Sequence, residues 1–370
     1  MVHSVLFLAL SACTASPLQQ TPGNPLPGPG SATLTPFLPA SETPTSTVTE
    51  TPTSTPSPSP TPSPTPSLRV DLAAVGDINL ARSIGERVQA EGPQIVFAGV
   101  QTSFDAADVL VGNLECAITT VSERQPKSYT FAAPLETAES LALAGFDVIG
   151  LANNHAMDYG YAGLEETRAT LEGYGIASAG AGANETEAHS PVIVERNGLR
   201  LAFLSFVDVP DESAGFSTRT WIATDTQPGI AWANVTQIAA DVAAAKTQAD
   251  VVIVLLHSGY EANDYLPIVS SNLRAEAQTA IDAGASLVIG SHPHALLPIV
   301  EYNGGLIAYS LGNFVFDGFT GLTNATIVLH VTLTPSGVED YSWTPVMIEN
   351  GLPRPATDTE IPAIESLLAP

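Results

Sequence analysis

The chain has 370 residues, with 38 Asp and Glu against 12 Lys and Arg, and a formal net charge of −26. Such a surface repels nucleic-acid backbones and anionic lipid surfaces, which excludes a nucleic-acid-binding protein and leaves a cation as the means of receiving an anionic substrate. The length could hold two average domains, but length is only a soft guide.

Residues 1–13 end in an apolar segment that is too short to span a bilayer and is typical of a secretory signal. Leu10-Ser11-Ala12-Cys13 resembles a bacterial lipobox, which implies cleavage before Cys13 and lipidation of its thiol. The usual positively charged start is missing, and a start codon placed too late would explain this. We expect an extracytoplasmic lipoprotein anchored to the membrane at the cell surface. The alternative is a chance apolar terminus with an ordinary cysteine.

Residues 14–67 contain no Lys or Arg and are rich in Pro, Thr and Ser. A segment of this composition has nothing to bury, so we predict a disordered, extended linker. It would serve as a tether after the lipidated cysteine. The other cysteine, Cys116, then has no partner, and we expect no disulfide.

From residue 68 onward, apolar runs alternate with helix-like stretches. Five runs end in polar residues, at 68–77, 109–115, 146–155, 251–257 and 287–294. Helices are predicted at 136–144, 161–173, 232–247 and 273–283. Alternation of this kind favours an α/β layered fold.

Further strands are predicted at 200–207, which opens the second half, and at 306–311, 324–333 and 341–348. We expect the last three to complete a second sheet. The expected fold is an αββα sandwich of two mixed sheets flanked by helices, in one domain over residues 68–350, with a C-terminal tail at 351–370.

The polar residues at the ends of the five runs are candidate metal ligands: Asp77, Glu115, Asn154, His257, His292 and His294. Two divalent cations that share a bridging carboxylate need oxygen and imidazole ligands from several strand ends, and His-x-His brings two rings from one loop. Taken singly, each carboxylate could be a helix N-cap or a turn residue. The recurrence of one pattern at five strand ends favours the metal site.

Several motifs together resemble those of one family. They are Gly76-Asp77, Gly112-Asn113-Leu114-Glu115, Asn153-Asn154-His155, His257-Ser258-Gly259-Tyr260-Glu261, Gly290-Ser291-His292-Pro293-His294 and Tyr309-Ser310-Leu311-Gly312-Asn313-Phe314. In this order, from about residue 70 to about residue 331, they resemble the CapA family of bacterial capsule and poly-γ-glutamate synthesis proteins. That family is similar to calcineurin-like metallophosphoesterases.

The resemblance implies roles for individual residues. Asp77 matches the first metal motif, and Glu115 the carboxylate that bridges two divalent ions, which could be Mn, Mg, Zn or Fe. Asn154 and His257 match further ligands, and His292 and His294 the closing pair, each facing one metal. His155 matches the general acid or an outer donor, oriented by a carboxylate such as Asp158.

One position departs from the phosphoesterase pattern. Where a second ligand, His, is expected two residues after the first Asp, this chain has Asn79, whose amide oxygen is a weaker ligand. Asn79, Asn113, Glu261 and Asn313 are candidate pocket residues. Glu261 could orient the ring of His257 or be a solvated carboxylate.

Other residues have simpler interpretations. His189 and His330 match no motif and are expected to be surface or packing residues. Lys127 could steady an anionic substrate, but an ordinary solvated loop is the simpler interpretation. Phe314, Phe316 and Phe319 are interpreted as core residues.

The resemblance implies a metal-dependent hydrolase that uses a metal-activated water on a phosphoester or an amide of poly-γ-glutamate or another capsule polymer. The first alternative is a non-catalytic accessory subunit that binds the polymer or a membrane synthase complex. The second is a general extracellular phosphoesterase. Expected partners are an anionic polymer and such a synthase; no nucleic acid is expected, and contact with the membrane is expected only through the lipid anchor.

Overall fold

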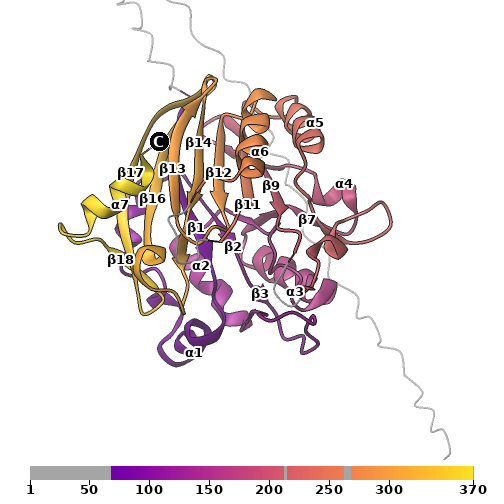
Figure 1. Cartoon of the computed structure of the whole chain (residues 1–370), viewed down its shortest axis with the longest axis vertical. Helices are drawn as coiled ribbons and strands as arrows, with labels where there is room; N and C mark the ends of the chain where they lie inside the picture. Colours follow the sequence, from indigo (N-terminus) through magenta and orange to yellow (C-terminus); the bar gives the residue numbers. More distant parts are fainter. Residues whose placement is uncertain (1–67, 212–214, 262–267, 370) are drawn as a thin grey trace, which may run out of the picture. The chain divides into compact units, whose positions relative to one another are not determined.

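The computed structural model describes residues 68–211, 215–261 and 268–369. The predicted signal segment, Cys13 and the predicted linker lie outside the described residues. The described residues form four layers, in which two sheets pack face to face and helices cover the outer face of each sheet (Figure 1).

The first sheet has the strand order β18-β17-β16-β1-β2-β5-β6, and β15 pairs with β1 beside β16. Strands β1, β2, β5 and β6 run parallel, whereas β16, β17 and β18 are antiparallel to their neighbours. The bounds are β1 (Val70–Ile78), β2 (Val109–Leu114), β5 (Val148–Gly150), β6 (Ala177–Ala179), β15 (Asn313–Val315), β16 (Ala325–Thr334), β17 (Gly337–Glu349) and β18 (Leu352–Pro355).

The second sheet has the order β13-β14-β12-β11-β9-β8, with β9, β11, β12 and β14 parallel. Its strands are β8 (Val192–Arg196), β9 (Leu199–Asp208), β11 (Val251–Ser258), β12 (Leu287–Ser291), β13 (Leu296–Tyr302) and β14 (Gly305–Leu311). Two small pairs lie outside the sheets: β3 (Ala117–Ile118) with β4 (Ala132–Ala133), and β7 (Ala181–Gly182) with β10 (Gly229–Ile230).

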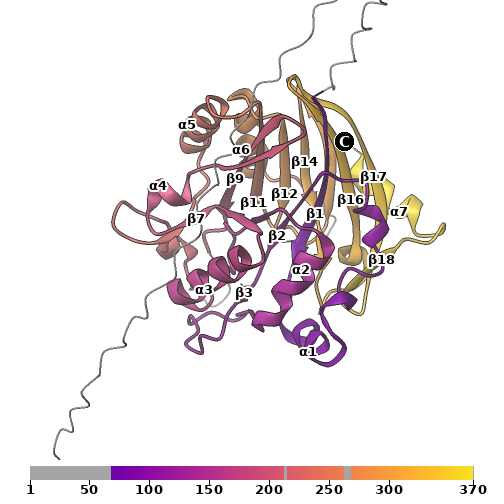
Figure 2. The same ribbon diagram turned by 180° about the vertical axis from the view of Figure 1, so that it is seen from behind.

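The alternation of side chains along β1 shows why the layers form. Val70 and Leu72 belong to the core between the sheets, whereas Ala73 and Val75 belong to the core under the helices. Helices α1 (Arg82–Glu91), α2 (Ala138–Ala144) and α3 (Gly160–Gly173) cover the first sheet, and α5 (Val235–Lys246) and α6 (Ser271–Asp282) cover the second (Figures 1 and 2). The predicted αββα sandwich is confirmed.

Two strands belong to a different sheet from the one predicted. Of the three late strands, only β14 joins the second sheet, while β16 and β17 extend the first. β2 occupies only one edge of β1, which leaves the other edge open. β16 pairs antiparallel along that open edge, with Val70 opposite Leu333, and so joins the first sheet. Helix α1, which was not predicted, follows β1 and buries Ile84 and Val88.

The last residues also belong to the fold. Residues 351–370, expected to be a tail, contain β18, which pairs with β17, and helix α7 (Ile361–Leu368). Ile364 and Leu368 of α7 are buried in the core between the sheets. A short helix, α4 (Glu185–Ala188), precedes β8.

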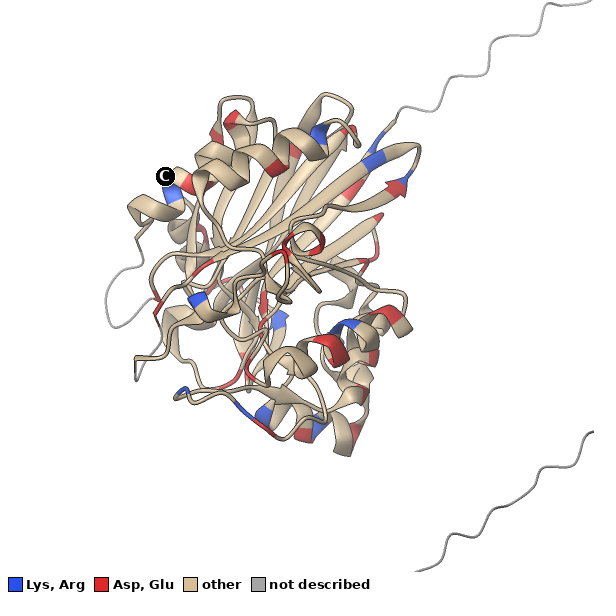
Figure 3. Ribbon diagram, turned by 90° about the vertical axis from the view of Figure 1, so that its right-hand side faces the viewer, with Lys and Arg blue, Asp and Glu red and all other residues tan. Residues whose placement is uncertain are grey.

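Acidic residues are distributed over helices, strands and loops, and Lys and Arg are few (Figure 3). Among the described residues, no helix has the length and apolar character needed to cross a bilayer. Cys116 is buried directly after β2, and burial raises the pKa of its thiol to about 12.

Candidate metal centre and cavity

The candidate ligands converge because parallel strands of both sheets end at one place. Asp77 lies in β1 and Glu115 follows β2 of the first sheet, whereas His257 lies in β11 and His292 and His294 follow β12 of the second. All five are buried. Carboxyl ends of parallel strands are the usual position of sites in open α/β sheets.

A close approach of two backbones fixes Asp77 in this position. A Cβ on Gly76 would lie 1.9 Å from the carbonyl oxygen of Gly312, so only glycine fits there. The N–H of Asp77 donates to that same carbonyl oxygen at 2.9 Å. The end of β1 is thereby attached to the turn that precedes Asn313.

Two groups of side chains could each hold a metal ion, and Glu115 belongs to both. One group is Asp77, Glu115 and His257; the other is Glu115, His292 and His294; within each group the ligand atoms lie within 4.8 Å of one another. Glu115 Oε1 is 3.7 Å from His257 Nε2 and 3.8 Å from His294 Nε2. A carboxylate between two imidazole groups is the arrangement required of a bridging ligand.

The donor set fits divalent cations. Imidazole and carboxylate groups are typical ligands of Zn, Mn and Fe, and all of these side chains are shielded from water. Nδ1 of His292 is buried and has no hydrogen-bond partner among the described residues. A buried polar atom of this kind costs free energy unless it has a partner, which a metal ion would supply.

Charge and burial prepare these groups for metal binding. Burial alone would raise the pKa of Asp77, but hydrogen bonding to His257, the charges of His257 and His294 and the N–H of His292 outweigh it, so that the pKa is lowered. Burial lowers the pKa of His257, and burial together with the neighbouring histidines lowers that of His292 well below its usual value. Neutral imidazoles and an ionised carboxylate are the forms that bind metal.

Polar side chains around His257 orient its ring. Nδ1 lies 2.9 Å from Ser291 Oγ, and Nε2 lies 2.7 Å from Asn154 Oδ1, which brings the predicted ligand Asn154 to the group. Asn113 donates from Nδ2 to Asp77 Oδ1 at 2.7 Å and also lies 3.2 Å from His257 Nδ1. The orienting role considered for Glu261 is not seen, since its exposed side chain lines the cavity instead.

The loop after β12 presents two rings at the cost of backbone strain. His292 and His294 have φ angles of 92° and 55°, a region that non-glycine residues seldom occupy. Asn313 Oδ1 lies 2.8 Å from His294 Nδ1, and Asn313 Nδ2 donates to the carbonyl oxygen of Thr323 at 3.1 Å. Asn313 therefore orients a candidate ligand.

His155 lies beside the ligands and belongs to a buried charged network. Its Nδ1 is 2.7 Å from Asp158 Oδ2, as predicted, and the other oxygen of Asp158 is 2.9 Å from Lys127 Nζ. The side chains of Lys127 and Asp158 are both fully buried, so the interpretation of Lys127 as a solvated loop residue was wrong. Its ammonium group also donates to the carbonyl oxygen of Asn154 and lies 5.1 Å from the ring centroid of Trp221.

Asn79 is buried in the short connection between β1 and α1. Its Oδ1 accepts a hydrogen bond from the N–H of Ala81 at 2.9 Å, which supports the turn into the helix. Its Nδ2 is buried and has no hydrogen-bond partner among the described residues.

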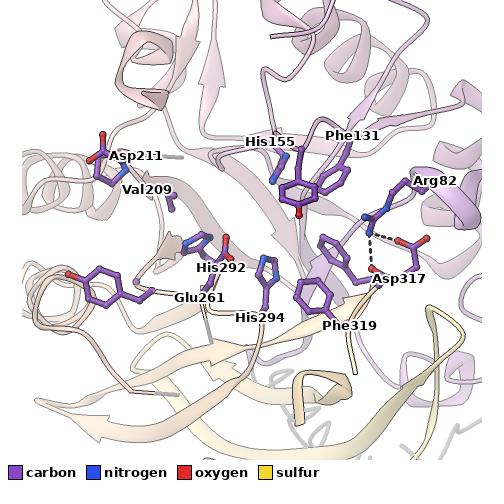
Figure 4. A pocket seen from close by; sticks show the side chains of 16 residues that line it. Arg82, Phe131, His155, Val209, Asp211, Glu261, His292, His294, Asp317 and Phe319 are labelled. Atoms are coloured by element: carbon purple, nitrogen blue, oxygen red, sulfur yellow. Dashed lines mark hydrogen bonds and ion pairs between the residues drawn. The ribbon is translucent and has the colours of Figure 1, made fainter. Parts of the chain in front are cut away.

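A cavity of ≈ 620 Å³ opens above the candidate metal centre. His155, His292 and His294 line it together with Phe131, Phe319 and Arg82 on one side and Asp211 and Glu261 on another (Figure 4). Phe316 is a further lining residue. Of the three phenylalanines expected in the core, Phe314 and Phe316 are buried core residues, and Phe319 is partly buried against the same core. Phe316 and Phe319 also line the cavity. An apolar wall beside a few polar groups is typical of a ligand site.

The two remaining described histidines lie outside this site. His189 pairs with Asp241 at 2.7 Å, and His330 lies 3.0 Å from Thr344 Oγ1 in the first sheet. Sequence reasoning did not find Arg82 or Ser291. The apolar spacing of Ile84 and Val88 would have revealed α1 and hence the position of Arg82.

The chain is similar to known proteins over most of its length. The family model described as bacterial capsule synthesis protein PGA_cap matches residues 71–318. The PGA biosynthesis protein CapA of Bacillus subtilis (strain 168) is 32% identical over 284 residues, 76% of this chain and 72% of that protein. The capsule biosynthesis protein CapA of Bacillus anthracis is 33% identical over 297 residues, 78% and 70% of the two chains. A phosphatase structure from Mycoplasma pneumoniae aligns with a TM-score of 0.49 and 10% identity, over 75% of this chain and 94% of that one.

Proposed function

The chain belongs to the bacterial capsule synthesis protein family, and from this membership we propose that it acts in the assembly of a capsule polymer such as poly-γ-glutamate. We propose further that it is a metal-dependent hydrolase of an amide in that polymer. The observation that carries this proposal is the pair of ligand groups that share Glu115, of which His292 and His294 line a cavity beside His155.

The residues that would hold two divalent ions are Asp77, His257 and Asn154 on one side and His292 and His294 on the other, with Glu115 between them. Bound there, the ions would polarise a carbonyl or phosphoryl oxygen and lower the pKa of a water molecule. They would also offset the negative charge of an acidic polymer that approaches an acidic protein.

His155 is the residue proposed to move a proton. Its Nδ1 is engaged by Asp158, which leaves Nε2 as the ring nitrogen available to the cavity that His155 lines. Asp158 is itself fixed by Lys127 and by the N–H of Phe131, which donates to Oδ2 at 2.7 Å. A ring held in this way can donate a proton to the leaving nitrogen of a cleaved amide.

We propose that the catalytic domain is extracytoplasmic and is tethered to the membrane through lipid on Cys13 and the Pro/Thr/Ser-rich linker. Support comes from the lipobox-like residues before Cys13 and from the composition of residues 14–67. A tethered domain would be close to a membrane synthase that exports the polymer.

A second candidate function is a non-catalytic accessory subunit that binds the polymer. The observation that favours it is Asn79, which stands where the phosphoesterase pattern has a histidine and whose amide oxygen is engaged by the N–H of Ala81. A weaker metal site would suit ligand capture better than turnover.

The test is cleavage of poly-γ-glutamate by the full chain with Mn²⁺, measured as new amine ends, with an aryl phosphate in parallel. The wild type should release amines, His155→Ala should lose at least about a hundredfold in rate, and His189→Ala, outside the site, should be unchanged. Metal binding without cleavage of either substrate would favour the accessory role. Cleavage of the aryl phosphate alone would favour a general phosphoesterase.

A further inference from the structure

One arginine lies a single aromatic ring away from the candidate metal centre. The guanidinium carbon of Arg82 is 4.8 Å from the ring centroid of Phe131, and that ring is 4.2 Å from the ring of His155 (Figure 4). Arg82 is also 5.8 Å from the ring of Phe316, which packs 5.3 Å from the ring of His294. Phe131 and Phe316 therefore join Arg82 to the general acid candidate and to a metal-ligand candidate.

The guanidinium group is held in place but not covered. Arg82 forms an ion pair with the carboxylate of Asp317, and its Nη2 donates to the carbonyl oxygen of Asp317 at 2.7 Å. Ser83 also binds the Asp317 carboxylate from its backbone N–H at 3.3 Å. The side chain of Arg82 is still 39% exposed and lines the cavity. Since a guanidinium group has five N–H donors, donors remain for a ligand.

The backbone at this position is strained. Arg82 has a φ of 52° although it is not glycine, at the first residue of α1. Strain of this kind persists where the surrounding structure fixes a functional side chain. Stacking on Phe131 and pairing with Asp317 are the contacts that fix it here.

The guanidinium group of Arg82 points to the kind of ligand. Among the described residues that line the cavity, Arg82 is the only Lys or Arg, whereas Asp211, Glu261 and Asp317 are acidic. The guanidinium group of Arg82 is paired with Asp317 but keeps further donors, an exposed side and a planar aromatic support. This geometry suits a second carboxylate, which a guanidinium group can bind through two parallel hydrogen bonds.

We propose that Arg82, supported by Phe131 and Phe316, forms a subsite for a carboxylate of the substrate next to the amide at the metal centre. This subsite selects chains that carry a carboxylate on each unit over neutral chains. The inference rests on the proposed function for the identity of the substrate as an acidic polyamide.

Binding can be measured without turnover, so the subsite and the hydrolase activity can fail separately. The probes are a γ-linked glutamate tetramer and the same tetramer with its α-carboxylates converted to carboxamides, titrated calorimetrically into the full Mn²⁺-loaded chain. Arg82→Met removes the guanidinium group, and Arg82→Lys keeps the positive charge without the two parallel N–H donors. Arg87→Met is the matched control. Arg87 lies on the same helix and pairs with exposed Glu91 at 3.0 Å, outside the cavity-lining residues.

The wild type should bind the acid tetramer, and Arg82→Met should weaken that binding by about tenfold to a hundredfold. Binding of the carboxamide tetramer should be weak and the same in both proteins. The affinity of Arg82→Lys for the acid tetramer should lie between those of the wild type and Arg82→Met. The affinity of Arg87→Met should match that of the wild type. Circular dichroism and the melting temperature identify any variant that is misfolded. If Arg82→Met is misfolded, Arg82→Lys is compared with the wild type in its place.

Equal binding of the acid tetramer by the wild type and Arg82→Met overturns the subsite, whether or not the protein cleaves the polymer. So does a wild type that fails to distinguish the acid from the carboxamide form. A third titration uses an aryl phosphate. If Arg82→Met weakens only phosphate binding, the group recognised is a phosphate and the carboxylate assignment is wrong.

Discussion

Substitution of Lys127 by methionine tests whether the buried charged network supports the fold of the site. Lys127 Nζ lies 2.9 Å from Asp158 Oδ1, and neither side chain is exposed. Removal of one partner from a buried ion pair costs about 3–5 kcal/mol, because the other charge stays buried without its counter-ion. Asp158 keeps two contacts, with His155 and with the N–H of Phe131, so we expect a loss near about 3 kcal/mol in the free energy of unfolding.

The assay is urea unfolding followed by the fluorescence of the three tryptophans, one of which, Trp221, has its ring centroid 5.1 Å from the ammonium group. The matched control is Lys246→Met, the other lysine of the chain, which donates to the carbonyl oxygen of Asp250 at 2.8 Å at the surface and should change stability by less than about 0.5 kcal/mol. The double variant with Asp158→Asn should recover at least about 1 kcal/mol, since no unpaired charge is then buried. A loss below about 1 kcal/mol for Lys127→Met would refute the reasoning.

Two further predictions concern the backbone and pH. Gly76→Ala should destabilise the fold by more than about 3 kcal/mol, because its Cβ would lie 1.9 Å from the carbonyl oxygen of Gly312; a melting temperature like that of the wild type would contradict this. Burial, together with Asp208, raises the pKa of Glu276 to about 8. The stability that Glu276 contributes is therefore fully present below pH ~4.5, where the carboxyl is neutral in the folded and the unfolded chain. It is lost as the pH rises towards 8, because the unfolded chain releases this proton first. Glu276→Gln should therefore be less destabilised than the wild type between pH 5 and pH 8 in urea unfolding, by on the order of 2 kcal/mol, and an unchanged pH dependence would show that Glu276 ionises normally.

The sequence predicted which side chains lie close together where one local pattern recurs. An apolar run that ends in polar residues marks the carboxyl end of a buried parallel strand, and parallel strands end together. This is why Asp77, Glu115 and His257 could be grouped from the sequence alone, and the family resemblance drawn from the same motifs is confirmed.

The membership of β16 and β17 in a sheet could not be predicted in the same way. β16 is mostly apolar and β17 mixes apolar and polar residues, and neither pattern specifies a sheet. The choice depends on which strand edge remains open after β1 has paired with β2. That is a long-range property, since Val70 pairs with Leu333 across most of the domain. Alternation within a strand predicts its buried face but not its neighbour.

Lys127 and Arg82 show the same limit for side chains. A lysine in a polar loop is usually solvated, and the burial of Lys127 follows only from the fold of residues 153–158 around it. Arg82 gains its place in the cavity from Phe131 and Asp317, which are distant in sequence. Neither contact leaves a periodic signal in the sequence.

Metal content is the most direct test of the two ligand groups that share Glu115. The full chain would be supplemented with Mn²⁺, dialysed and analysed by mass spectrometry beside Glu115→Gln, His257→Ala and the control His330→Ala, whose ring contacts Thr344 away from the site. We predict about two Mn²⁺ per chain in the wild type and the control, about one in His257→Ala and fewer than one in Glu115→Gln. A wild type without bound metal, or a Glu115→Gln variant that keeps the full content, would contradict a shared dinuclear centre.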